Sequence, residues 1–208
     1  MTERPILFTP GNVRAILDGT KTQTRRIVKL PAAPNHLGTW EPTTVGGPEG
    51  GLTKNGGTLP EMLALWHTRT GLCITCPFGV PGDRLWVREG LCKSPGGLVQ
   101  YRRDLKVVGW AEWEWQRLTL SPIHMPRKFA RFWLEITDVR IQRLQEISEE
   151  DAIGEGVTIK QDARIAALVA KDMPGRMEYW ALCESIHGKG SWEMNPWVWA
   201  ITFKQVKA

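Results

Sequence analysis

The stretch Thr9–Leu30, TPGNVRAILDGTKTQTRRIVKL, decides how the chain folds around its most polar segment. Thr9 followed by Pro10 is typical of a helix N-cap and first helical position. Gly19 can adopt the left-handed conformation that ends a helix. One face of the helix between them carries the apolar residues Val13, Ile16 and Leu17. From Thr20 onward, Thr, Arg, Ile and Val favour a strand, so we expect a helix of about ten residues, a glycine turn and a basic strand.

Further strands are predicted by alternating apolar and polar residues. This pattern occurs in Arg84–Glu89, where Leu85 and Val87 should point inward, in Arg131–Val139, and from Trp197 to Phe203. Scattered strands with few helices, and no regular alternation of the two, predict an α+β fold with a mostly antiparallel, barrel-like sheet.

Three more helices are expected in the second half of the chain. Ser148 before three acidic residues is typical of a capped helix start, and Gly154 and Gly156 end that short helix. The other two helices are expected over residues 161–171 and 174–187.

Residues 31–60 contain seven Gly and five Pro, which predicts no regular element there. We expect a flexible insertion at about 31–75 within a single domain that spans residues 1–208. A plain surface loop is favoured over a substrate lid.

Composition limits the classes of protein. The chain has 208 residues and a net charge of +5, which favours anionic ligands. No apolar run approaches the ~20 residues of a membrane helix, and the N-terminal residues lack the features of a secretory signal. We therefore expect a cytoplasmic protein with four reduced cysteines. Eleven Trp suit either a core or a surface on which bases stack.

Lys21 and Thr24 are the candidate catalytic pair, three residues apart just after the glycine turn. A lysine with a lowered pKa can act as base for a hydroxyl nucleophile, and neighbouring Arg25 and Arg26 would lower that pKa. The same residue types are also common at a solvated strand end, and that alternative stays open.

We expect no metal and no cofactor. Cys73 and Cys76 have the spacing of half a zinc site, but a second such pair is missing, and two small buried residues are the favoured interpretation. The acidic run Glu149–Asp151 is typical of a helix N-terminus. No paired spacing links the histidines, which are His36, His67, His124 and His187.

The segment Gly19–Arg26 resembles the Gly-x-Lys-x-x-Thr-x-Arg motif of the ASCH domain family, which belongs to the PUA-like superfold. More narrowly, the chain is similar to ASCH-related proteins of tailed phages and prophages. Residues 31–75 carry least of the resemblance. The other segments that carry it are Pro5–Phe8, Val13–Leu17, Pro81–Glu89, Ile123–Arg127, Ile147–Ala152 and Asn195–Trp199.

The resemblance implies a small β-barrel flanked by short helices, with a cleft suited to RNA or nucleotides, and the host cytoplasm as location if the gene is phage-encoded. Some compact bacterial members, about half as long as this chain, remove the acetyl group from N4-acetylcytidine with a lysine, a threonine and a later glutamate. These residues correspond to Lys21, Thr24 and Glu155, and the rivals for the glutamate are Glu149, Glu150 and Asp151.

Glu155 lies between two glycines, which allow a close backbone approach, so its carboxylate could act as an acid or orient the lysine. An exposed glutamate in a loop is the alternative. Trp192 is a candidate for stacking on a base and Asn195 for contacting its edge. Arg88 and Arg127, like Arg25 and Arg26, could contact phosphate or carboxylate, or pair with neighbouring acids. Core packing is the favoured role of Trp197 and Trp199.

These observations leave three hypotheses. The first is an ASCH-type hydrolase that cleaves an amide of a modified nucleoside such as N4-acetylcytidine. The second is a PUA-like module that binds RNA or a nucleotide without chemistry. The third is a ribonuclease. The expected partner is a nucleoside, nucleotide or RNA, and the oligomeric state stays open.

Overall fold

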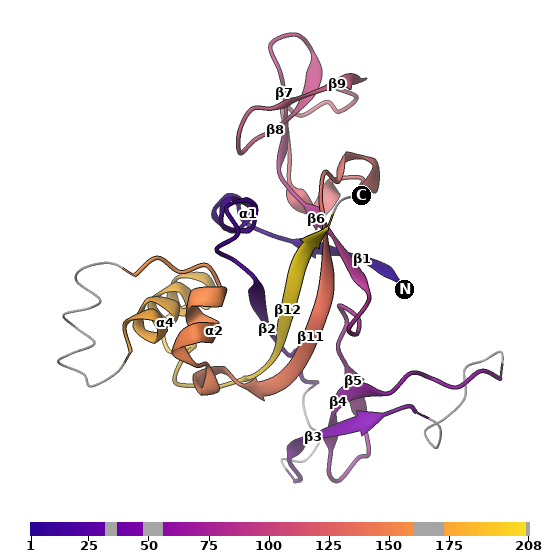
Figure 1. Ribbon diagram of the computed structural model, residues 1–208, viewed down its shortest axis with the longest axis vertical. Helices are drawn as coiled ribbons and strands as arrows, with labels where there is room; N and C mark the ends of the chain where they lie inside the picture. The colour runs from indigo at the N-terminus through magenta and orange to yellow at the C-terminus, as the bar shows by residue number, and fades with distance from the viewer. Residues whose placement is uncertain (32–36, 48–55, 160–172, 207–208) are drawn as a thin grey trace.

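The computed structural model describes residues 1–31, 37–47, 56–159 and 173–206, which form an α+β fold of mostly sheet with a few short helices (Figure 1). The strands are β1 (Glu3–Leu7), β2 (Gln23–Ile27), β3 (Trp40–Val45), β4 (Met62–His67), β5 (Cys73–Thr75), β6 (Arg84–Arg88), β7 (Leu91–Lys93), β8 (Leu98–Tyr101), β9 (Val107–Glu112), β10 (Thr119–Leu120), β11 (Trp133–Arg143) and β12 (Trp197–Val206). The helices are α1 (Pro10–Leu17), α2 (Glu149–Gly154) and α4 (Pro174–His187), with 3-10 turns η1 (Pro122–His124), η2 (Arg127–Phe129) and η3 (Leu144–Glu146).

The strands form three sheets. The main sheet has the order β1-β6-β11-β12-β2, in which only the β1–β6 pair is parallel. A four-stranded sheet, β10-β7-β8-β9, lies at one end of the long axis, and a three-stranded sheet, β3-β4-β5, lies at the other end (Figure 1). The mostly antiparallel α+β prediction is therefore confirmed.

The main sheet is curled but not closed, so the expected barrel is wrong for the part of the chain that the structure describes. Strands β1 and β2 are its two edges, and no ladder of backbone hydrogen bonds joins them. The Arg26 side chain links the edges instead, because its Nη2 donates to the Leu7 carbonyl at 2.7 Å. The chain leaves β1 at Leu7 to begin α1, capped by the Thr9 hydroxyl, before it can pair with β2.

The main core confirms that Leu85 and Val87 point inward, but the strict alternation expected from Trp197 to Phe203 is wrong, because residues 198–201 of β12 are all buried. Leu85 and Val87 of β6 are fully buried, as are Leu134 and Ile136 of β11. Leu65 of β4 belongs to the same core, so the three-stranded sheet packs on the main sheet.

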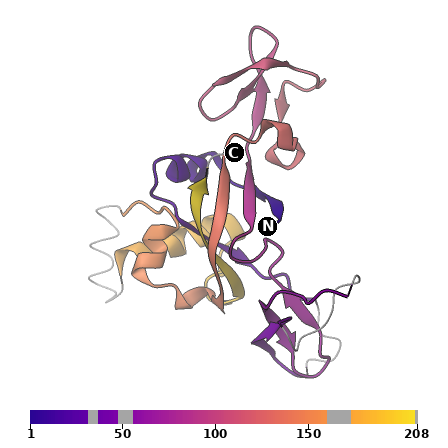
Figure 2. The ribbon, with the colours of Figure 1, turned by 45° about the vertical axis from the view of Figure 1, so that its right-hand side comes forward.

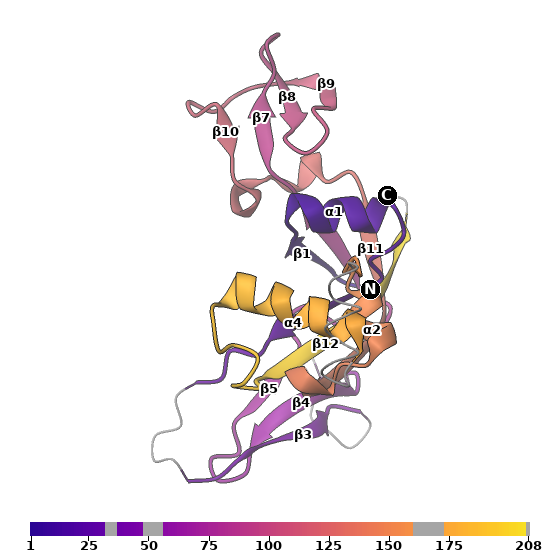
Figure 3. The same cartoon turned by 90° about the vertical axis from the view of Figure 1, so that its left-hand side faces the viewer.

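The described helices agree with the predictions. Thr9 Oγ1 accepts from the Asn12 amide at 3.3 Å, and Gly19 has a φ of 73°. Ser148 caps α2 by accepting from the Asp151 amide at 3.1 Å. Helix α4 packs beside α2, and α1 lies apart from both (Figure 3). The helix expected over 161–171 lies outside the described residues. Among the described helices, none is long and apolar enough to cross a membrane.

The prediction that residues 31–60 lack regular structure is wrong for β3, which the structure places at Trp40–Val45. This strand pairs antiparallel with β4, and the Trp40 ring packs on His67 with centroids 5.1 Å apart. Its partner follows some twenty residues later, so local composition did not reveal it. In the Cys pair, Cys76 is buried as expected and Cys73 is exposed, which corrects the expectation of two buried residues.

The four-stranded sheet projects from the main sheet and has its own core (Figure 2). The sequence allowed no assignment between Tyr101 and Leu118, where β9 lies. The buried residues of this second core are Leu91, Val99, Tyr101, Ala111, Leu120, Met125 and Phe129.

Candidate functional site

Lys21 and Glu155 meet at the free edge of the main sheet, 134 residues apart in sequence. The Lys21 Nζ donates to the Glu155 carbonyl and to its Oε2, both at 2.7 Å, and an isolated backbone bridge joins the two residues. Their exposed fractions are 3% and 4%. The sequence-based pairing of these two candidates thus corresponds to a buried ion pair.

Local geometry explains why the two backbones can come so close. Helix α1 stops before Lys21, whose amide donates to the Ala15 carbonyl at 3.0 Å, and α2 ends at Glu155. Gly156 follows with a φ of 81°, and a Cβ at this position would lie 2.9 Å from the Lys21 Cβ. A glycine is therefore required here for the approach.

Arg25 and Asp151 extend the ion pair into a network. Arg25 Nη2 contacts Asp151 Oδ2 at 2.7 Å, and Nη1 lies 3.5 Å from Glu155 Oε1. Gln23 and Arg140 also donate to Asp151, at 3.1 and 3.0 Å. Asp151, weighed from sequence as a rival of Glu155, is instead the acid that holds Arg25 in place.

One oxygen of this network has no hydrogen-bond partner. Glu155 Oε1 is buried, and the Arg25 contact at 3.5 Å is a charge contact that does not meet hydrogen-bond geometry. A buried acceptor without a donor costs free energy, so its presence in a folded protein calls for an explanation. A role in ligand binding or catalysis is one such explanation. A ligand N–H group would satisfy this oxygen.

Burial lowers the pKa of the Lys21 ammonium, and the nearby charges of Arg26 and Arg25 lower it further, while Glu155 opposes the change. Burial is the largest cause, so the predicted effect of the two arginines is present but secondary. Tyr179 lies against the Arg25 guanidinium at 5.9 Å, and burial and Glu155 raise its pKa well above the usual value.

Thr24 is buried in β2, opposite Ile201 of β12. This register places Thr24 on the face of the main core, whereas Arg25 points to the face covered by α2 and α4. Among the described side chains, no hydrogen bond joins Thr24 to Lys21. The Lys21 Nζ lies 5.9 Å from the centroid of Phe8, a residue of the main core, so the ammonium sits beside both faces of the edge strand.

Arg26 also borders the site. Its guanidinium lies over the Phe8 ring at 5.2 Å and near Phe78 at 6.0 Å, and its buried Nε has no hydrogen-bond partner. Burial lowers its pKa. It remains a candidate for contact with a polar substrate atom.

Arg88 and Arg127 are not brought to this site. Arg88 donates to the Met125 carbonyl at 3.1 Å and lies over the Trp86 ring at 5.1 Å. Arg127 pairs with Glu3 on β1, the opposite edge strand of the main sheet. Pairing with neighbouring groups, one of the two sequence-based alternatives, describes both contacts.

Trp192 lies near the site and Asn195 has a structural partner. The Trp192 ring packs edge-on against Tyr179 at 6.5 Å. Asn195 has a φ of 43°, and its Oδ1 accepts from the Gln145 amide at 2.9 Å, which stabilises the turn before β12. Trp199 is buried in the main core, as expected.

Sequence reasoning missed Tyr179. It gave Asp151 a helix N-terminal role and a place among the rivals of Glu155, but it did not predict the contact with Arg25. Tyr179 lies in the middle of α4, and its spacing gives no sign that it meets Arg25. Asp151 contacts Arg25 from 126 residues away, so its position in the first turn of α2 gives no sign of this contact.

A groove of about 670 Å³ lies elsewhere, between the three-stranded sheet and the start of β1 and β6. It includes Thr2, Arg4, Met62 and Asp83, and none of its lining residues belongs to the Lys21 network. Because Lys21, Thr24 and Glu155 are all buried, the network is closed in the described part of the chain, in contrast to the cleft that the resemblance implies. The described residues also contain no group of three His, Cys, Asp or Glu arranged for a metal ion.

Comparison of the chain with protein families, curated proteins and solved structures finds no match in any of the three.

Proposed function

We propose that the protein is an ASCH-type hydrolase with a PUA-like fold that cleaves an amide of a modified nucleoside such as N4-acetylcytidine. The observation that carries the proposal is the buried Lys21–Glu155 pair with an unpartnered Glu155 oxygen. Buried ionisable groups with altered pKa values concentrate at functional sites. The curled sheet with flanking helices is compatible with the proposed fold family.

The ion pair can supply both a base and an acid. Burial disfavours the charged form of Lys21, so the proposal moves one proton from Nζ to Oε2 over the 2.7 Å contact, which yields a neutral amine and a carboxylic acid. The lowered pKa of Lys21 supports this transfer. In the neutral pair, Lys21 can accept a proton and Glu155 can donate one.

The proposed reaction has two steps. The Thr24 hydroxyl attacks the acyl carbon and gives its proton to Lys21, the C–N bond breaks, and Glu155 protonates the departing amine. Water then attacks the acyl-threonine ester, Glu155 accepts the water proton, and Lys21 returns a proton to the Thr24 oxygen. The products are the free amine and a carboxylic acid. Thr24 faces the main core and makes no hydrogen bond to Lys21 among the described side chains, so the proposal requires substrate binding to bring the two side chains together.

Release of acetate from N4-acetylcytidine tests the proposal. We expect wild type to turn over and Lys21→Ala, Thr24→Ala and Lys21→Arg not to, because arginine keeps the charge but cannot act as a base. Glu155→Gln should reduce turnover more than binding. Glu89→Gln is the matched control, since it alters another buried ion pair far from β2.

A binding module without chemistry is the second candidate, and one observation favours it. The Lys21 ammonium already has two acceptors, and the network is closed, as in a purely structural ion pair. If wild type binds nucleosides without releasing acetate, and Lys21→Ala weakens that binding, this function replaces the hydrolase. Nothing in the described side chains favours the ribonuclease hypothesis over these two.

A further inference from the structure

The projecting four-stranded sheet carries an exposed stacked tryptophan. Trp110 of β9 is 67% exposed, yet its ring lies parallel to Phe129, with centroids 5.5 Å apart and an interplanar angle of 9°. One ring face is thus covered by Phe129 and the other is open to solvent. A ring held flat with one free face is how proteins that bind single strands present a stacking site.

Two more tryptophan rings, those of Trp113 and Trp115, extend the aromatic cluster around Phe129. Trp115 packs edge-on to Phe129 at 5.9 Å, and Trp113 packs edge-on to Trp115 at 4.8 Å. Trp113 Nε1 donates to the Arg117 carbonyl at 2.8 Å, which holds the loop after β9. Trp110 is therefore the outermost ring of a packed cluster. Ordering such a surface costs little entropy when a ligand binds.

The segment that contains this sheet, residues 91–130, has an excess of positive charge. Residues 91–130 contain seven Lys and Arg against three Asp and Glu, so their net charge is +4, while the whole chain has +5. Lys128 places its Nζ 5.0 Å from the Phe129 centroid, directly beside the stack. The other exposed basic residues of this segment are Lys93, Arg102, Lys106, Arg117 and Arg127, of which Arg127 pairs with Glu3.

We propose that this sheet is a docking surface for unpaired RNA, with a base stacked on the free face of Trp110 and a phosphate beside Lys128. Aromatic rings among basic groups match single-stranded nucleic acid, whereas the centre of a protein interface is depleted of charge. RNA is the chosen partner because its loops and ends expose unstacked bases, which stay paired in duplex DNA. The surface is separate from Lys21 and does not depend on the proposed hydrolase.

Fluorescence anisotropy with a labelled, unstructured RNA of about twelve nucleotides tests the docking surface. We expect Trp110→Ala to weaken binding about tenfold or more, and Trp110→Phe to weaken it less because a smaller ring remains. Lys128→Ala should reduce the salt slope by about 0.7, the value of one phosphate contact on a single strand. Trp180→Ala is the control, since Trp180 is a 40% exposed tryptophan on α4.

Three results would overturn the proposal: unchanged affinity of Trp110→Ala with a native melting curve, equal affinity for an RNA duplex, or tighter binding of single-stranded DNA. Sedimentation that shows a dimer of the wild type and a monomer of Trp110→Ala would assign the surface to a second copy of the chain instead. Lys21→Ala should bind the RNA normally, and Trp110→Ala should hydrolyse free nucleoside normally. Failure of either proposal is thereby told apart from failure of the other.

Discussion

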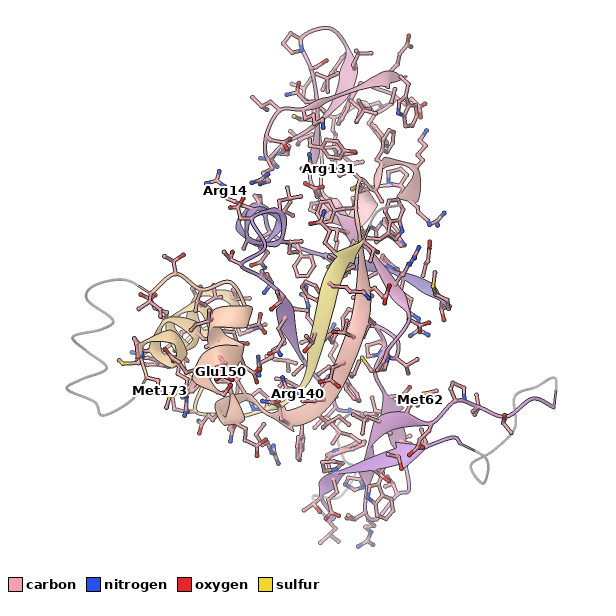
Figure 4. The ribbon with its side chains drawn as sticks, viewed as in Figure 1. Arg14, Met62, Arg131, Arg140, Glu150 and Met173 are labelled. Carbon is pink, nitrogen blue, oxygen red and sulfur yellow. The ribbon has the colours of Figure 1, made fainter. Side chains whose placement is uncertain are left out.

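Two buried ion pairs lie in different parts of the molecule, and they differ in how completely they are satisfied. Arg131 lies at the root of the four-stranded sheet (Figure 4). It donates to both oxygens of Glu89, at 2.7 and 2.6 Å, and to Asp104 at 2.7 Å. At the edge of β2, Glu155 keeps one oxygen without a hydrogen-bond donor. The satisfied pair is suited to joining two sheets, and the unsatisfied pair to receiving a ligand.

Arg131 and Lys21, the cations of the two ion pairs, also differ in how readily they lose a proton. Burial alone would lower the pKa of Arg131, but the hydrogen bonds that it donates to Glu89 and Asp104 raise it, so Arg131 stays charged. Burial lowers the pKa of Lys21, and a lysine, unlike an arginine, can lose its proton within an accessible pH range. A buried ion pair becomes a candidate for chemistry only where a proton can move within it.

The largest effect is expected when the satisfied pair loses one partner. Glu89→Ala should lower the free energy of unfolding by about 3–5 kcal/mol, because Arg131 is left buried without its main acceptor. Urea denaturation measures this loss. Glu135→Ala, which removes the half-buried partner of the exposed Lys204, should cost about 1 kcal/mol or less. If both variants lose the same free energy of unfolding, the Glu89–Arg131 pair stabilises the fold no more than the Glu135–Lys204 pair does.

The next effect concerns turnover at the unsatisfied pair. Lys21→Ala or Thr24→Ala should reduce the rate of acetate release by a factor on the order of 10² or more. The double variant should be little slower than either single one, because the two residues act as a unit. Steady-state rates of the three variants provide the measurement, and additive losses would separate the roles of Lys21 and Thr24.

A smaller effect is expected from the glycine that lets the unsatisfied pair form. Gly156→Ala meets both a positive φ and a close Cβ contact, so it should cost about 1–3 kcal/mol more than Gly71→Ala, where only the positive φ applies. Thermal or urea unfolding of both variants gives the difference. If the two variants lose the same stability, the close approach to Lys21 does not constrain the fold.

The smallest effect is a pH dependence. Because the pKa of Lys21 is lowered on folding, the unfolded chain binds more protons between that pKa and 10.5, and the Lys21 contribution to stability rises with pH in this window. The slope is limited to about 1.4 kcal/mol per pH unit for one group. Stability measured against pH for wild type and Lys21→Met should diverge in favour of wild type as pH rises.

Lys21→Met is the needed reference, because burial raises the pKa of Tyr101 to about 12 and of Cys183 to about 11, and both groups destabilise the fold at high pH. These two contributions are present in both proteins and cancel in the difference. A difference that stays constant from pH 7 to 10 would mean that Lys21 has an ordinary pKa.

Much of the secondary structure could be predicted from sequence, and much of the pairing could not. Thr9 and Ser148 mark helix starts because their side chains cap amides three residues away. Strand β3 was missed because its hydrogen-bond partner is distant and its own composition is that of a loop. The barrel was expected from scattered strands without regular strand–helix alternation, but closure depends on whether the edge strands β1 and β2 pair.

The sequence by itself determined the helix, turn and basic strand that present Lys21, because caps, glycine stops and alternation depend on neighbours within a few residues. Only the tertiary structure decided that Glu155 meets Lys21, that Asp151 and Tyr179 hold Arg25, and that Arg127 lies at the opposite edge. The physical reason is that these contacts join segments more than a hundred residues apart. They form only when the whole sheet places its edges and buries their charges.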